Sequence, residues 1–160
     1  MDVFLTDTDI QELITERKQM SIASSALFHN MKEKRGHKES EYIIERPDGS
    51  SFIIKIRISI ENTLDFSALL GYSPAKSTKL FILCRYNGRS HEHKNKLESK
   101  NTFYDFHIHK ATERYQRAGT KEEYYAEVTD RYSTVQEALN CLIIDCNIEL
   151  PPNSQLHLEI

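Results

Sequence analysis

Two isoleucine-rich stretches on either side of a tight-turn sequence constrain the fold of this chain more than any other feature. Residues 41–46 and 51–58 flank Pro47-Asp48-Gly49-Ser50. Pro-Asp-Gly between two β-branched stretches is a strong signal for a β-hairpin. In the second stretch the apolar side chains at positions 52, 54, 56 and 58 share one face, and Lys55 and Arg57 take the other. The sequence therefore predicts an antiparallel strand pair with one buried face.

Helix signals lie near both ends of the chain. Thr6 is a candidate N-cap with Asp9 in the first turn, which predicts an amphipathic helix over residues 6–19. Ser133 and Thr134 precede a second helical pattern, with apolar residues at helical spacing from 135 to 146. Further strands are predicted at 79–86, 103–109 and 122–129, whereas residues 64–70 are expected to cover an edge or face of the sheet. This order predicts an α+β fold with a mostly antiparallel sheet of about five strands, packed by N- and C-terminal helices.

Length and composition exclude several classes of protein. The 160 residues fit one domain, and we assign residues 1–150 to a single α+β domain and residues 151–160 to a C-terminal tail. Apolar runs are only a few residues long, which predicts no membrane partner, and no secretory signal is expected. The three cysteines lack the paired spacing of a disulfide framework or a zinc knuckle, so we expect a reducing, cytoplasmic compartment.

The net charge of −3 hides an uneven distribution. Residues 85–121 contain nine basic and four acidic side chains, a net charge of +5, together with four of the seven histidines. A locally positive field attracts polyanions even when the whole chain is acidic. RNA or another phosphate ligand is therefore one candidate partner and a protein is another, while a solvated lysine-rich loop is the alternative interpretation.

Strand alternation predicts where the histidines of residues 103–109 point. Tyr104, Phe106 and Ile108 should face the core, which leaves Asp105, His107 and His109 on the opposite face. If this strand pairs with the preceding one across the loop of residues 87–102, Arg85 comes near the same face. The His91-Glu92-His93 triplet of the loop is then placed to close over it.

Three functions fit this group, beside a purely structural role in which the histidines bond to the backbone or to carboxylates. In the first, His107, His109 and His91 are acid–base catalysts of phosphodiester cleavage, and Arg85 stabilises the developing charge. In the second, His107 and His109 bind a metal, but no third ligand has the spacing of a zinc motif, so no metal or cofactor is assigned. In the third, the face binds an anion or partner without chemistry. Candidate substrate-binding residues are Arg89, Lys110, Arg114 and Tyr115.

The order of short motifs resembles a family of small bacterial proteins of unknown function found in chromosomes and mobile elements, including phage. The motifs that carry the resemblance span most of residues 5–148 and include Asn87-Gly88-Arg89-Ser90-His91, His107-Ile108-His109, Glu113-Arg114-Tyr115, Asp130-Arg131-Tyr132-Ser133 and Cys146-Asn147-Ile148. The chain departs from the family in the loop, where it has His91-Glu92-His93-Lys94-Asn95 instead of a histidine followed by a short Asn-Pro-Asp-Gly turn. The resemblance implies no established activity, but it groups Arg85, His91, His107, His109, Glu113 and Tyr115 in one recurring set.

These observations favour a bacterial or mobile-element protein that acts on a phosphodiester. Its most concrete form is a histidine-dependent ribonuclease, a toxin of a toxin–antitoxin or phage-defence system. The alternative is a non-catalytic binding module, an inhibitor or adaptor, that uses the basic, histidine-bearing face for a nucleic acid or a protein. The sequence leaves open both whether the chain is an enzyme and its oligomeric state.

Overall fold

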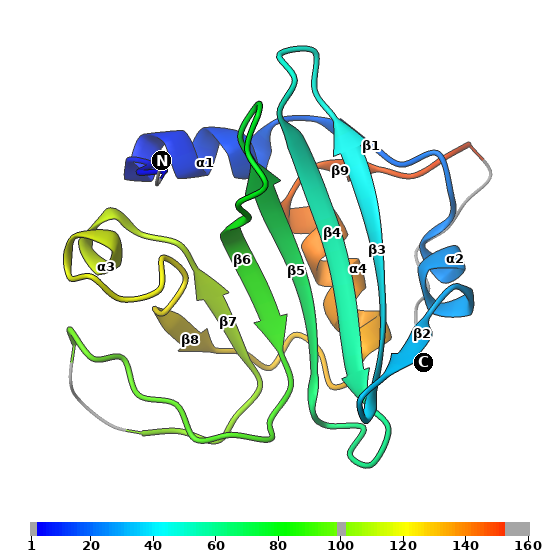
Figure 1. Ribbon diagram of the computed structural model, residues 1–160. Helices are drawn as coiled ribbons and strands as arrows, with labels where there is room; N and C mark the ends of the chain where they lie inside the picture. The colour runs from blue at the N-terminus through cyan, green and yellow to red at the C-terminus, as the bar shows by residue number, and fades with distance from the viewer. Residues whose placement is uncertain (1–2, 99–101, 153–160) are drawn as a thin grey trace.

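A seven-stranded antiparallel sheet forms the centre of the protein in a computed structural model, which describes residues 3–98 and 102–152 (Figure 1). Each strand pairs with its neighbour in the chain, in the order β2-β3-β4-β5-β6-β7-β8. These strands are β2 (Lys32–Lys34), β3 (His37–Glu45), β4 (Ser51–Ser59), β5 (Phe66–Ser73), β6 (Phe81–Asn87), β7 (His107–Lys110) and β8 (Ala126–Val128). A short parallel pair joins β1 (Lys18–Gln19) to β9 (Ile148–Glu149).

The longest helix packs against one face of this sheet and closes the core. The helices are α1 (Asp7–Thr15), α2 (Ser24–His29), α3 (Glu113–Arg117) and α4 (Val135–Asp145). In Figure 1, α4 lies behind β4 and β5. It also contacts β6, and its apolar side chains meet those of the strands in one buried cluster. The predicted α+β class with an antiparallel sheet is therefore confirmed. No helix among the described residues is long and apolar enough to cross a membrane.

The predicted hairpin and helix caps are present. β3 and β4 pair from His37 with Ser59 to Glu45 with Ser51, and Gly49 in the turn has a φ of 90°, a conformation that suits glycine. Thr6 and Asp9 form a reciprocal capping box at α1, and Thr134 caps α4. α1 ends earlier than residue 19. Beyond its end, Nζ of Lys18 lies 2.7–2.9 Å from four backbone carbonyl oxygens, those of Leu13, Ile14, Glu16 and Cys146, which share its three N–H donors.

Three details of the predicted sheet are wrong. The sheet has seven strands instead of about five, because β2 extends it beyond the hairpin and residues 66–73 form β5. β5 is the middle strand, and it is buried on both faces at Leu69 and Leu70, so its apolar residues do not alternate with polar ones. Tyr104 lies outside β7 and is 56% exposed instead of joining the core. Residues 153–160 of the predicted tail lie outside the described residues.

Gly88, directly after β6, lies too close to a neighbouring backbone to carry a side chain. A Cβ at Gly88 would lie 1.9 Å from the carbonyl oxygen of Leu64, whereas a Cβ at Gly71 would meet only the flexible side chain of Leu80. We expect Gly88→Ala to lower the free energy of unfolding by about 1–3 kcal/mol, the usual cost of overpacking. Urea denaturation checks this, with Gly71→Ala as the matched control that loses less. Equal losses in the two variants would contradict the packing described for Gly88.

Candidate functional site

The register between β6 and β7 sets the position of the candidate site. Arg85 pairs with His109, and Asn87 pairs with His107. Ile108 lies opposite Tyr86, whose hydroxyl donates a hydrogen bond to Asp145 of α4. Because side chains alternate along a strand, the two histidines and Arg85 lie on the sheet face away from α4. The predicted pairing across the long loop is therefore present.

A third histidine from the loop packs onto this pair. The ring of His93 lies parallel to that of His107, with centroids 5.5 Å apart, and edge-on to that of His109 at 4.9 Å. The rings of His107 and His109 are 4.8 Å apart. His93 is held in place by two backbone hydrogen bonds with Phe103, each 2.9 Å long. The loop thus closes over the strand histidines through His93, whereas His91 is exposed.

Asn95 attaches the loop to the edge of the sheet. Its Oδ1 accepts a 2.9 Å hydrogen bond from the Ala126 N–H, and its Nδ2 donates to the Ala126 carbonyl at 2.7 Å. These bonds identify Oδ1 as the acceptor, so Nε2 of His93, 2.9 Å away, is the donor of the third bond. Sequence reasoning missed Asn95, since a single asparagine in a polar loop carries no pattern.

Backbone carbonyl groups determine which nitrogen of His107 and His109 carries the proton. Nδ1 of His107 lies 2.8 Å from the Asp105 carbonyl oxygen, and Nδ1 of His109 lies 3.3 Å from that of Tyr124. A carbonyl oxygen can only accept, so in both rings Nδ1 is the donor. The neutral rings therefore keep a lone pair on Nε2, and neither Nε2 atom makes a hydrogen bond to another described residue.

Burial keeps both strand histidines uncharged at neutral pH. His107 is only 4% exposed, and burial lowers its pKa. Burial is the main cause that lowers the pKa of His109 to about 3, and electrostatic repulsion from His107, His93 and Arg85 adds to it. These rings are consequently hydrogen-bond acceptors at Nε2 instead of cations.

A buried ion pair lies beside the histidines. The guanidinium of Arg85 donates a 2.8 Å hydrogen bond to the carboxylate of Glu123, which is 5% exposed. Burial raises the pKa of Glu123 and the charge of Arg85 opposes that rise. Nε of Arg85 is buried and has no hydrogen-bond partner among the described residues. Arg85 thus keeps donor capacity beyond its bond to Glu123.

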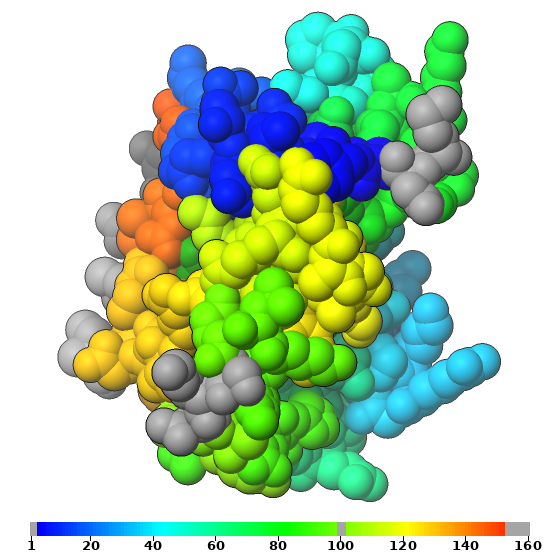
Figure 2. All heavy atoms as spheres, turned by 90° about the vertical axis from the view of Figure 1, so that its left-hand side faces the viewer, coloured from blue at the N-terminus to red at the C-terminus, as the bar shows by residue number. Residues whose placement is uncertain are grey.

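His93, His109, Arg85 and Glu123 line a pocket of about 470 Å³ that we call the histidine pocket, whereas His107 packs behind them and is not among its lining residues. Its lining residues are Arg85, His93, Lys96, His109, Gly119, Thr120, Lys121, Glu123 and Tyr124. Three side chains are cationic and one is a carboxylate, and Nζ of Lys96 lies 4.9 Å from the centre of the Tyr124 ring. Figure 2 shows the two covering segments, the loop after β6 in green and the stretch after β7 in yellow, side by side at this end of the molecule.

The candidate substrate-binding residues lie outside this pocket. Arg89 is exposed over the ring of Phe106, with 5.9 Å between the guanidinium carbon and the ring centre. Lys110 follows His109 on β7, so its side chain points to the opposite face of the sheet. There its Nζ donates a hydrogen bond to the side chain of Gln11 in α1. Arg114 forms an ion pair with Glu98. Tyr115 is fully buried and its hydroxyl donates to the same carboxylate.

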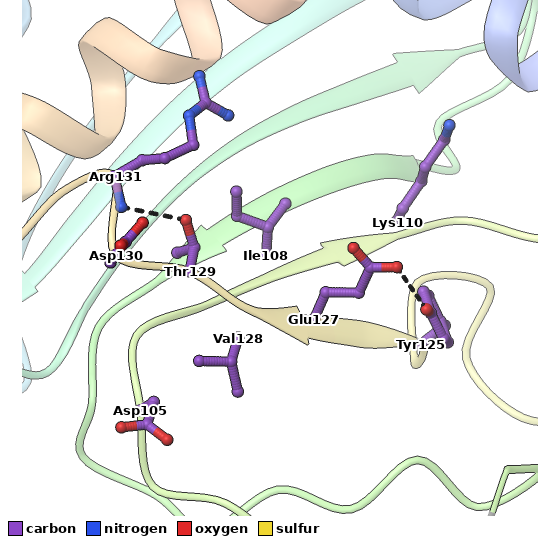
Figure 3. A pocket seen from close by; sticks show the side chains of 9 residues that line it. All are labelled: Asp105, Ile108, Lys110, Tyr125, Glu127, Val128, Thr129, Asp130 and Arg131. Atoms are coloured by element: carbon purple, nitrogen blue, oxygen red, sulfur yellow. Dashed lines mark hydrogen bonds between the residues drawn. The ribbon is translucent and has the colours of Figure 1, made fainter.

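A second, larger pocket of about 880 Å³ lies on the α4 side of β7 and β8 (Figure 3). Its lining residues are Asp105, Ile108, Lys110, Tyr125, Glu127, Val128, Thr129, Asp130 and Arg131. The charged groups are of both signs and several have partners, since Arg131 pairs with Asp145 and Tyr125 donates to Glu127. Because this pocket contains no histidine and has three carboxylates against two cations, it is a weaker candidate for the site.

The structure gives no support for a metal centre in the described parts of the chain, where no three side chains of metal-binding types are arranged to hold an ion. Comparisons with models of known protein families, with curated proteins and with solved structures find no match. The function must therefore be inferred from the histidine pocket itself.

The histidines make a specific prediction about stability and pH. The pKa values of His107 and His109 lie below the ordinary value of about 6.5, so the unfolded chain binds protons more readily than the folded one. Their contribution to stability is complete above about pH 6.5 and is lost as the pH falls below that value, in the case of His109 down to about pH 3. Asparagine has no group that binds a proton in this range. We therefore expect the free energy of unfolding, measured by urea denaturation, to fall less between pH 7 and pH 5 for His109→Asn than for the wild type.

His29 is a suitable control because it is exposed at the end of α2. His29→Asn should keep the pH dependence of the wild type. A wild-type stability that does not fall between pH 7 and pH 5 would show that the strand histidines are not held uncharged.

Proposed function

We propose that this protein is a non-catalytic nucleic-acid-binding module that holds a backbone phosphate in the histidine pocket. The observation that carries the proposal is the convergence of three cations, Arg85, Lys96 and Lys121, on one pocket next to a single carboxylate. Proteins hold phosphate groups chiefly with lysine and arginine side chains, and this contact supplies much of the affinity for a nucleic acid.

The three cations differ in the role that they suit. Arg85 is held in position by Glu123, so its guanidinium can act as a fixed cation in the wall of the pocket. Lys96 and Lys121 are exposed, and their long side chains can follow a phosphate at the rim. An anion in this pocket would offset the local excess of positive charge.

The charge state of the histidines favours binding over cleavage. Acid–base cleavage of a phosphodiester needs one group that accepts a proton and another that donates one. His107 and His109 have lowered pKa values and are both uncharged at neutral pH, while His91 is exposed on the loop. A histidine-dependent ribonuclease therefore has a weaker physical basis than a non-catalytic binding module. Such a module corresponds to the adaptor or inhibitor that the sequence offers as the alternative.

In this proposal the protein acts in the cytoplasm and is encoded by a bacterial chromosome or a mobile element. RNA is the partner that we favour. The cysteines of the described chain fit a reducing compartment. All three are free thiols, and Sγ of Cys84 and Sγ of Cys146 lie 3.6 Å apart without a bond between them.

Charge reversal at the rim tests the proposal. We expect the double variant Lys96→Glu/Lys121→Glu to bind a fluorescein-labelled single-stranded RNA at least about tenfold more weakly than the wild type, measured by fluorescence anisotropy. The slope of log affinity against log salt should also fall by about 1.4, since each lost contact to a single strand removes ~0.7.

A matched control changes the same charge at the opposite end of the sheet. Lys32→Glu/Lys38→Glu alters two exposed lysines of β2 and β3, where a second basic cluster lies. This variant should bind like the wild type. Equal loss in both double variants, or no binding by the wild type, would refute a phosphate site in the histidine pocket.

A further inference from the structure

We propose that the histidine pocket selects RNA over DNA because His109 accepts a hydrogen bond from a ribose 2′-hydroxyl group next to the bound phosphate. This inference rests on the proposed function and adds the class of nucleic acid that the pocket recognises. It follows from one atom, Nε2 of His109, and from the groups that surround it.

A hydrogen bond and ring packing together fix the orientation of the His109 ring. Nδ1 donates to the Tyr124 carbonyl, and the ring packs against those of His93 and His107 at 4.9 and 4.8 Å. Turning the ring over would break the bond to Tyr124. Nε2 of His109 is therefore a fixed acceptor on a ring that lines the same pocket as Arg85, Lys96 and Lys121.

A phosphate alone does not satisfy this combination of groups. The oxygens of a backbone phosphodiester accept hydrogen bonds from the cations but carry no hydrogen at neutral pH that they could donate to Nε2. In RNA the 2′-hydroxyl lies on the sugar carbon adjacent to the one that carries the 3′-phosphate, so one nucleotide presents a donor and an anion together. DNA has only C–H groups at this position, which would leave the acceptor unpaired in the complex.

Sites that bond to a hydroxyl discriminate strongly against the analogue that lacks it, because the site's polar group then loses its partner. A protonated His109 would contact the phosphate directly and would treat RNA and DNA alike. Burial opposes that state, since it holds the pKa of His109 at about 3. The geometry and the charge state thus favour the same ligand.

The test compares three oligonucleotides of one sequence by fluorescence anisotropy: RNA, DNA and 2′-fluoro RNA. The 2′-fluoro sugar keeps an RNA-like shape but cannot donate a hydrogen bond. We expect the wild type to bind RNA about tenfold more tightly than either of the other two. His109→Phe, which keeps a ring but removes the acceptor, should bind all three equally and at the affinity that the wild type has for DNA.

The controls separate this inference from the proposed function. Lys96→Glu/Lys121→Glu should weaken binding to RNA and DNA by the same factor and so keep their ratio. If His109→Phe does not fold, the comparison of RNA with 2′-fluoro RNA on the wild type decides alone.

Each remaining outcome has one meaning. Equal wild-type affinity for RNA and 2′-fluoro RNA would overturn the hydroxyl contact and leave phosphate binding in place. Absence of binding to all three would overturn both proposals. Cleavage of RNA, but not of 2′-fluoro RNA, that depends on His109 would support the hydroxyl contact and overturn the non-catalytic part of the proposed function.

Discussion

The antiparallel pairing of β6 with β7 is the interaction on which the rest of the site depends. Its register puts Arg85 opposite His109 and directs Ile108 toward the helix-covered face. A slip of one residue would exchange the two faces of β7, burying the histidines against α4 and exposing the apolar side chain. The burial of Tyr86 and its hydrogen bond to Asp145 hold β6 against α4, and thus fix the strand on which β7 pairs.

The covering loop gives the pocket its chemical character. His93 packs on the strand histidines and Asn95 bonds to the edge strand, so the loop excludes water from rings that would otherwise titrate near neutral pH. The same burial that removes charge from His109 preserves its lone pair. The positive charge of the pocket therefore comes from arginine and lysine, and the histidine supplies a neutral acceptor. This division of roles is the physical basis of the proposed preference for RNA.

Much of this arrangement could be predicted from the sequence, because it follows from local patterns. Strand alternation placed His107 and His109 on one face, the hairpin argument brought Arg85 near them, and capping residues located the starts of α1 and α4. Two features could not be predicted. β5 is buried on both faces and lacks alternation, and Glu123, Lys121 and Asn95 enter the site from loops, where only tertiary packing brings them together.

Nuclear magnetic resonance spectra of isotope-labelled protein, titrated with a short single-stranded RNA, map most directly where RNA binds. If RNA binds in the histidine pocket, the signals of Arg85, His109 and Lys121 shift together and saturate at one RNA per chain, while those of the exposed strand β2 stay unchanged. Shifts centred on β2 and β3, or around the larger pocket on the α4 side, would contradict the central claim that the histidine pocket is the binding site.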